Sequence, residues 1–321
     1  MKHISLLLQA FFVISLSIYA PIAEADSVIE IFITEGDDYD LIELYDLYFP
    51  MAAIMTGGHV GDETDGTSGM HVYQSNTCDI SGGTVDYLHM YDSSTAYISG
   101  GTVSHYDCWD TQTITANDYS TINIYDGGFL DGGSFHIFDL YDSSTVNIYG
   151  GDVHLFLYAH NYSTVNSYDG DCYLGIIPHD YSTTNVYGGY VGSYAGDPPD
   201  ETATVNIYGY AFNYDPNARW CGNPNEGYWI GKLTGYGCEG IAIEYWGLPD
   251  PNMHENINLI PDFIPARGVN LADFAVFASA WKTQEGDAKW NNICDVSDPN
   301  DNMIDERDLA VLTKYWSAGI E

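Results

Sequence analysis

Between residues 80 and 208 the chain consists of short runs in which apolar and polar residues alternate. One phrase returns throughout this stretch, and its clearest copy is STVNIYGG at residues 144–151. A unit this short has an apolar side that it cannot bury alone, so successive units are expected to stack into a solenoid. Six copies are centred on threonines that lie 19 to 26 residues apart, namely Thr95, Thr121, Thr145, Thr164, Thr183 and Thr204.

The alternation within one phrase assigns each residue to a face of a strand. Val146 and Ile148 fall on one face, and Thr145, Asn147 and Tyr149 fall on the other. The aliphatic face is expected to point inward. A step of 19 residues leaves no room for a crossover helix, so the coils must pair in parallel through strands and corners alone. The sequence therefore predicts a mainly β fold, a parallel β-helix. It resembles the solenoids of pectate lyases and autotransporters, and this resemblance implies a right-handed winding.

Two kinds of corner separate the predicted strands. Paired glycines at residues 82–83, 100–101 and 150–151 mark one corner, where glycine permits a positive φ. The other corner follows the pattern Asp-x-Ser-Thr, in which aspartate or asparagine favours an Asx-turn. The residues at its first position are Asp92, Asp118, Asp142, Asn161 and Asp180.

The regions on either side of the phrases are less regular. The open first rung of a solenoid needs a cap, which we expect residues 26–56 to supply. His254–Ile260 is expected to be the last strand, and Pro261–Pro265 a linker. These boundaries divide the chain into an N-terminal segment (1–25), an N-terminal cap with the first coils (26–76), the solenoid repeats (77–209), a C-terminal cap of the solenoid (210–261) and a C-terminal module (262–321).

The C-terminal segment has a helical pattern that occurs twice. Residues 271–281 carry apolar residues at helical spacing, and a similar pattern returns at residues 308–316. In both copies an aspartate precedes a tryptophan by eight residues, and the copies are offset by 35 residues. The predicted apolar face of the first helix comprises Leu271, Phe274, Phe277, Ala278 and Trp281.

This duplicated segment, covering about residues 262–318, resembles a type I dockerin in the divergent form of planctomycete-like secreted proteins. Dockerins are paired calcium-loop-and-helix modules of cellulosomes. The resemblance implies calcium as the cofactor, a cohesin-like protein or a cell-surface assembly as the partner, and an association with polysaccharide breakdown. The alternative is a helical hairpin whose loop acids are simply solvated.

A calcium loop needs oxygen ligands at alternating positions and a carboxylate at the twelfth, where the helix begins. The first loop is degenerate, because Ile264 and Ala266 stand where ligands belong, and it keeps only Asp262, Asn270 and Asp273. The second loop is stretched by two residues. Its candidate ligands are Asp295, Ser297, Asp301, the Met303 carbonyl, Asp305 and Asp308.

The N-terminus has the features of an export signal. A basic start at residues 1–3 precedes an apolar run at residues 4–20, and Ala23-Glu24-Ala25 is a small-x-small cleavage site. This pattern predicts a signal peptide over residues 1–25 and a secreted or cell-surface protein. A membrane anchor is the alternative, but the run is at the short limit for a span.

The charge of the chain restricts its partners. The formal net charge is −38, with eight Lys plus Arg, and no Lys or Arg occurs between Ser27 and Ala218. Nucleic acids and anionic lipids need basic groups, so neither is an expected partner. Polyuronates would need a bridging divalent cation.

The six cysteines do not form a zinc pattern. Cys78, Cys108 and Cys172 lie in different coils and are interpreted as small core residues. Cys221 and Cys238 lie in one non-repetitive segment and can pair, because export permits disulfides. Cys294 lies in the C-terminal segment.

The outward rows of the solenoid are a candidate binding site. Rings that stack on sugars and amides that bond to hydroxyls would suit a neutral polysaccharide. The alternative is that like residues on successive rungs stabilise one another without a ligand. The residues concerned are Tyr125, Tyr149, Tyr168, Tyr187 and Tyr208, beside Asn123, Asn147, Asn166, Asn185 and Asn206.

An enzyme site is the other possibility. The lack of Lys and Arg in the solenoid argues against lyase chemistry, which typically uses one of them as the base. Hydrolysis of a glycan needs two carboxylates roughly 5–10 Å apart. Most of the acids recur at turn positions, where a turn role suffices. The candidates weighed are Asp86, Asp92, Asp126, Asp142 and Asp169, with His89, His105, His136 and His154.

We therefore expect a secreted, non-catalytic scaffold that binds neutral carbohydrate and is tethered to an extracellular assembly through the C-terminal module. The alternative is a glycoside hydrolase on a parallel β-helix. An enzyme predicts one place where a non-repeating acid pair breaks the ladder pattern, whereas a scaffold predicts unbroken ladders.

Overall fold

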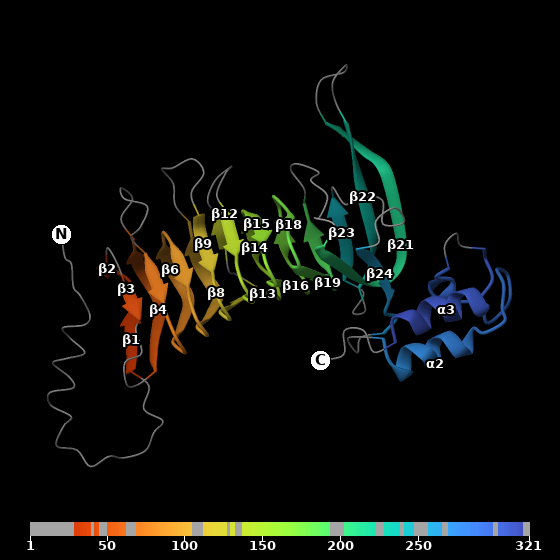
Figure 1. Cartoon of the computed structure of the whole chain (residues 1–321), viewed down its shortest axis with the longest axis horizontal. Helices are drawn as coiled ribbons and strands as arrows, with labels where there is room; N and C mark the ends of the chain where they lie inside the picture. Colours follow the sequence, from red (N-terminus) through yellow and green to blue (C-terminus); the bar gives the residue numbers. More distant parts are fainter. Residues whose placement is uncertain are drawn as a thin grey trace, which may run out of the picture.

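Parallel strands stacked coil over coil form the body of the protein, with two helices beside its C-terminal end (Figure 1). The computed structural model describes residues 29–39, 42–44, 50–61, 69–104, 112–126, 129–131, 137–192, 202–221, 228–237, 241–246, 256–264, 269–297 and 301–316. The predicted signal peptide and the side chains of Cys108, Cys221 and Cys238 lie outside this description.

Each coil contributes to three faces, which we name after residues that recur on them. The Thr face contains β1 (Ile29–Ile33), the first halves of β4 (Met51–Val60), β6 (Thr77–Val85) and β8 (Thr95–Val103), then β10 (Thr121–Ile124), β13 (Thr145–Ile148), β16 (Thr164–Ser167), β19 (Thr183–Val186), β21 (Thr204–Cys221) and β24 (Ile257–Pro261).

The Asp face contains β2 (Asp38–Tyr39), the second halves of β4, β6 and β8, then β11 (Phe129–Asp131), β14 (Asp152–His154), β17 (Asp171–Cys172), β20 (Gly189–Val191) and β23 (Ala242–Trp246). These two faces belong to one 17-stranded sheet. The His face is a separate 7-stranded sheet of β3 (Ile42–Leu44), β5 (Met70–Val72), β7 (Leu88–Met90), β9 (Gln112–Ala116), β12 (Ile137–Leu140), β15 (Phe156–Ala159) and β18 (Ile176–Pro178).

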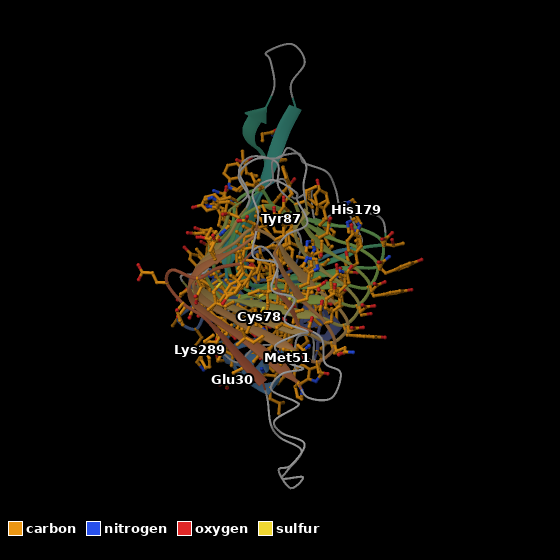
Figure 2. All side chains as sticks on the ribbon, turned by 90° about the vertical axis from the view of Figure 1, so that its left-hand side faces the viewer. Glu30, Met51, Cys78, Tyr87, His179 and Lys289 are labelled. Atoms are coloured by element: carbon orange, nitrogen blue, oxygen red, sulfur yellow. The ribbon has the colours of Figure 1, made fainter. Side chains whose placement is uncertain are left out.

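The predicted stacking of the phrases is confirmed. The phrase threonines pair in parallel with one another from coil to coil, and Thr77 joins them below Thr95. Val146 and Ile148 are completely buried, whereas Thr145 and Asn147 are partly exposed. Figure 2 views the coils end-on, with Cys78 inside the stack. Full burial of each aliphatic residue contributes about 1.5–3 kcal/mol, so the shared interior holds the coils together.

The solenoid starts earlier than the phrases indicate. Residues that were expected to form a cap already lie in the first coil, since β1 pairs in parallel with β4 and β3 pairs with β5. Ile33 and Leu44 are fully buried in the common interior.

The solenoid also continues beyond the last phrase. β24 extends the Thr face and β23 extends the Asp face, both in parallel. Between β21 and β23, the strand β22 (Tyr228–Tyr236) pairs antiparallel with both.

The glycine corners have the predicted backbone. Gly101 has φ of 68°, and a Cβ there would lie 2.8 Å from the carbonyl carbon of Gly82 in the coil below. Both the conformation and the close approach of two coils therefore require glycine at this position.

The aspartate corners differ from the Asx-turns that were expected. Their first residues adopt left-handed backbone, with φ between 54° and 59°. Most of their side chains bond to the preceding coil: Asp118 accepts the Asp92 amide at 3.1 Å, and Asp180 accepts the Asn161 amide at 3.0 Å. Aspartate and asparagine tolerate this backbone best among residues with a side chain.

The C-terminal module packs against the solenoid. It contains α2 (Leu271–Ser279), a short 3-10 turn η2 (Asn292–Cys294) and α3 (Glu306–Lys314). Both α-helices begin with a capping box, Asn270 with Asp273 and Asp305 with Asp308. Asp262 and Phe263, in the expected linker, are buried.

The predicted apolar face of the first helix is only partly confirmed, because Phe277 and Trp281 pack into the buried cluster of the module and the other members do not. Phe277 is 1% exposed, but Leu271 is 74% and Phe274 is 40% exposed, and Ala278 is also exposed. The helix is rotated about its axis relative to the prediction, and the capping box explains this rotation. The box turns Asp273 inward, and Phe277 lies on the same side of the helix.

Candidate functional site

The asparagine row forms a continuous hydrogen-bonded ladder on the Thr face. Each side-chain amide donates to the Oδ1 of the asparagine one coil earlier, at distances of 2.8–3.0 Å. At the start of the row, the Asn123 amide donates to the Ala96 carbonyl at 3.3 Å. The members are Asn123, Asn147, Asn166, Asn185, Asn206 and, beyond the last phrase, Asn258.

The tyrosine row beside it is a continuous ring stack. Successive ring centroids lie 4.5–5.1 Å apart, and the planes are within 15° of parallel. Tyr168, Tyr187 and Tyr208 are only 5–7% exposed, because the C-terminal module covers them. Phe263, Phe277 and Leu312 belong to the same buried cluster, so the last three rings of the row form the seat of the module.

This arrangement removes most of the predicted carbohydrate platform. A sugar stacks on the face of a ring, whereas these ring faces contact one another and three of the five rings lie under the module. Tyr149 is partly buried and Tyr125 is 36% exposed. The observed geometry matches the alternative, in which like residues stabilise each other from coil to coil.

The second loop of the module holds its candidate ligands in two different ways. Asp295 Oδ1 and Ser297 Oγ are buried and have no hydrogen-bond partner among the described residues. Burial raises the pKa of the Asp295 carboxyl, and the carboxylates of Asp308 and Asp301 add to the rise. A buried, partnerless oxygen next to concentrated negative charge fits a bound cation.

Asp308, by contrast, already has hydrogen-bond partners. Its Oδ1 accepts the amides of Val296 and Ser297 at 2.8 Å, and its Oδ2 accepts the Asp305 amide at 2.9 Å. Among the other candidates, Asp301 pairs with Arg307 at 2.7 Å, and Asp305 caps α3. Met303 forms a β-bridge with Gln284. No group of three or more His, Cys, Asp or Glu side chains within the described part of the chain has metal-binding geometry.

In the first loop an aspartate also accepts backbone amides, as Asp308 does in the second loop, but fewer of the expected calcium ligands are present. Asp273 is fully buried and accepts the amides of Phe263 at 2.8 Å and Asn270 at 2.9 Å. The side-chain oxygen of Asn270 accepts the Ala272 amide and so caps α2. Asp262 is buried beside this loop, and Ala266 lies outside the described residues.

The catalytic candidates of the solenoid are dispersed. Asp92 and Asp142 occupy aspartate corners, Asp126 is exposed after a phrase, and Asp169 accepts the following amide. Burial, with the neighbouring His71, lowers the pKa of His89 to about 4. His154 contacts the Tyr173 ring edge-on at 4.3 Å. His105 and His136 lie outside the described residues.

Asp86 is part of a constellation that sequence reasoning missed. Its buried carboxylate lies 3.0 Å from His59 Nε2, and the exposed Asp38 lies 3.2 Å from His59 Nδ1. Burial lowers the pKa of His59, but the hydrogen bonds to Asp86 and Asp38 outweigh it and raise the pKa overall. The three residues come from different strands or coils, so only the stacking register could have linked them.

A carboxylate pair on the Asp face was also missed. Asp152 and Asp171 are direct partners on β14 and β17, and the Tyr173 hydroxyl donates to Asp171 at 3.3 Å. Tyr190 takes the next position in the register, so the carboxylates do not continue as a ladder. The signal available in the sequence was the shared offset of both aspartates from their glycine corners.

Comparisons with protein families, with curated proteins and with solved structures find no match to this chain. In the described part of the chain, no helix combines the length and the hydropathy needed to span a membrane.

Proposed function

We propose that the protein is a secreted, non-catalytic β-solenoid scaffold that is tethered to an extracellular assembly by its C-terminal module. The observation that carries this proposal is the uninterrupted asparagine ladder, which repeats from Asn123 to Asn258 without a break for a catalytic group. A right-handed winding and export through residues 1–25 complete the proposal.

The module offers a surface for a partner. Leu271, Phe274 and Trp316 are 74%, 40% and 43% exposed, and the Phe274 and Trp316 rings meet edge-on at 6.3 Å. Exposed apolar residues gathered on one small module are typical of protein interfaces. A cohesin-like protein or a cell-surface assembly, as the dockerin resemblance implies, is the partner that we propose for this surface.

We further propose that the second loop binds calcium. Asp295 and Ser297 would hold the ion through their buried oxygens, and the carboxylate of Asp301 lies close enough to raise the pKa of Asp295. The Met303 carbonyl is a further candidate ligand. Asp308 and Asp305 would act mainly by bracing the loop and capping α3. Calcium would supply positive charge to a loop that concentrates carboxylates, and so would stabilise the fold of the module.

Calcium titration of the full chain tests this proposal. A ligand that binds only the folded state stabilises it by about 2.7 kcal/mol at 100 times its Kd. We expect calcium to raise the melting temperature followed by tryptophan fluorescence, and Asp295→Asn to abolish this rise. Glu285→Gln, an exposed acid of the same module, is the matched control and should respond like the wild type.

Asp308→Ala is a poor test, because it removes three backbone hydrogen bonds as well as a carboxylate. A wild-type protein indifferent to calcium after treatment with a chelator would refute the calcium site without touching the scaffold proposal.

A neutral polysaccharide remains the proposed carbohydrate ligand, at the exposed N-terminal end of the tyrosine row. There Tyr125 is 36% exposed, and Tyr97, which pairs in register with Asn123 at the start of the asparagine row, is 40% exposed. Binding of neutral glycans to the wild type but not to Tyr125→Ala would support this ligand, and equal binding by both would exclude this location.

One observation favours a glycoside hydrolase as the second candidate. Asp152 and Asp171 lie on adjacent rungs, so their Cα atoms are separated by about 5 Å. A retaining mechanism needs about 5–5.5 Å between its two carboxyl groups, and side chains on adjacent rungs can reach that separation. Release of reducing sugar from neutral glycans, lost in Asp171→Asn, would establish the hydrolase and overturn the scaffold proposal.

A further inference from the structure

One column of residues projects outward at the aspartate corners. Each member directly follows the residue in left-handed backbone, and its amide donates to the corner carbonyl one coil earlier at 2.8–3.0 Å. All members are exposed, and among the tyrosines whose side chains the structure describes, Tyr119, Tyr162 and Tyr181 are the most exposed, at 72%, 67% and 59%. We call this row the corner column: Ser93, Tyr119, Ser143, Tyr162 and Tyr181.

Between its first and last tyrosines, the corner column lacks a ring at one position, Ser143. Tyr162 and Tyr181 stack with centroids 5.5 Å apart and planes 12° from parallel, so the other face of Tyr162 is directed toward the coil of Ser143. Serine has no ring to cover that face. Tyr119 lies one coil further, so the two tyrosines are two rungs, or about 10 Å, apart along the axis.

The carboxylate at this rung also differs from its neighbours. Asp92, Asp118 and Asp180 each accept the amide of the preceding corner residue, as Asn161 does through its side-chain oxygen. Asp142 is the exception, because its exposed carboxylate has no hydrogen bond to any other described residue. The coil without a ring is therefore also the coil with an uncommitted negative charge.

We propose that the notch formed by Tyr119, Asp142 and Tyr162 binds a quaternary ammonium group. A cation midway between the rings would lie about 5 Å from each centroid, within the range of about 6 Å for cation–π attraction. A trimethylammonium group fills this space, whereas a flat guanidinium is too thin to touch both rings. This site goes beyond the proposed scaffold function and does not depend on it.

Charge complementarity determines the class of ligand. Asp118 and Asp142 flank the notch, and the chain has no Lys or Arg between residues 27 and 218 to neutralise them. An anion would be repelled, and a neutral sugar would gain nothing from the free carboxylate's charge. An organic cation is attracted by both ring faces through cation–π interactions and by the carboxylate through its negative charge.

The test uses the full chain with choline chloride and, as a neutral probe of the same shape, 3,3-dimethyl-1-butanol. The ring currents of the two tyrosines should shift the choline methyl proton resonance upfield in a saturable way. For an exposed notch we expect a Kd on the order of 1–10 mM that increases with ionic strength. The neutral probe should bind at least about fivefold more weakly.

Two serine variants provide matched insertions of the same ring. Ser143→Tyr fills the missing rung and should abolish choline binding, whereas Ser93→Tyr adds a tyrosine outside the notch and should leave binding unchanged. Neighbouring copies carry tyrosine at this position, so both variants should fold, as circular dichroism will check. Tyr162→Ala and Asp142→Asn should each weaken binding at least about fivefold.

Three results would overturn the proposal. The first is the absence of a saturable choline shift, and the second is equal affinity for choline and the neutral probe. The third is retention of binding in Ser143→Tyr, which would place any choline site elsewhere. Binding of a neutral oligosaccharide that Ser143→Tyr abolishes, without binding of choline, would assign the notch to sugars.

Discussion

Replacing Tyr187 with alanine should loosen the C-terminal module from the solenoid. The Tyr187 ring is 7% exposed and is stacked between Tyr168 at 4.9 Å and Tyr208 at 4.5 Å. It also belongs to the buried cluster formed with the module. Tyr125→Ala is the matched control, because Tyr125 lies in the same row, is 36% exposed and stacks on Tyr149.

The burial of the two rings sets the expected magnitudes. Removing a buried aromatic side chain costs about 3–5 kcal/mol, which includes the cavity left behind. Removing Tyr125 loses mainly the attraction of a single ring pair, about 0.5–1.5 kcal/mol. We therefore expect Tyr187→Ala to lose at least about 2 kcal/mol more than Tyr125→Ala. Tyr187→Phe keeps the ring and should cost no more than about 1.5 kcal/mol, the contribution of one hydrogen bond.

Guanidinium unfolding monitored by two probes can separate the module from the coils. A solenoid need not unfold in one step, so circular dichroism reports the strands, and tryptophan fluorescence reports the module in a background where Trp109, Trp220, Trp229 and Trp246 are replaced by phenylalanine. Trp281 and Trp290 pack against the cluster that contains Tyr187. In Tyr187→Ala the fluorescence transition should move to lower denaturant than the dichroism transition. Equal losses in Tyr187→Ala and Tyr125→Ala would refute the conclusion that the module is seated on this row.

Two further predictions concern polar groups of the solenoid. Asn166→Ala leaves the Asn147 oxygen and the Asn185 amide without their bonds of 2.8 Å, so it should cost about 1–3 kcal/mol in chemical denaturation, and an unchanged midpoint would show that the ladder adds nothing. The pKa of His59 is raised in the folded state, so the stabilisation from His59 should be complete below about pH 6.5 and lost as the pH rises through the folded-state pKa. His59→Gln should therefore destabilise the protein more at pH 5.5 than at pH 8.5. An equal effect at both pH values would contradict this prediction.

Period-two alternation made the solenoid predictable from the sequence. In the phrase around Val146, alternation fixes which side chains point inward, and the shortness of the unit excludes a helical crossover. The same pattern cannot tell what covers an outward side chain. Tyr125 and Tyr187 occupy equivalent positions in their phrases, yet only Tyr187 lies under the module.

The misassigned helix face has a local cause that the sequence contained. Asn270 followed three residues later by Asp273 is a capping-box pattern, and the box buries Asp273. Counting apolar residues alone placed Leu271 and Phe274 inward, but the cap fixes the rotation of the helix. The His59 constellation, in contrast, depends on a register between distant coils that no local pattern specifies.

The distribution of charge explains how long ladders persist in so acidic a chain. Residues 27–218 contain no Lys or Arg, so the carboxylates of this stretch have no Lys or Arg within it to form ion pairs with. Two carboxylates one rung apart, about 5 Å, repel by roughly 1 kcal/mol in water and by more when partly buried. From Asn123 onward the asparagine and tyrosine rows of the Thr face are neutral, so coils can approach there without this cost.

Acids lie instead at the aspartate corners and on the Asp face, and water and ions screen those that are exposed. Most of the corner carboxylates are further stabilised by a backbone amide, and Asn161 interrupts their row between Asp142 and Asp180. The solenoid thus separates two roles in space. Neutral side chains hold the coils together on the Thr face, and carboxylates without a Lys or Arg partner lie at the corners and on the Asp face, where a cation can reach them.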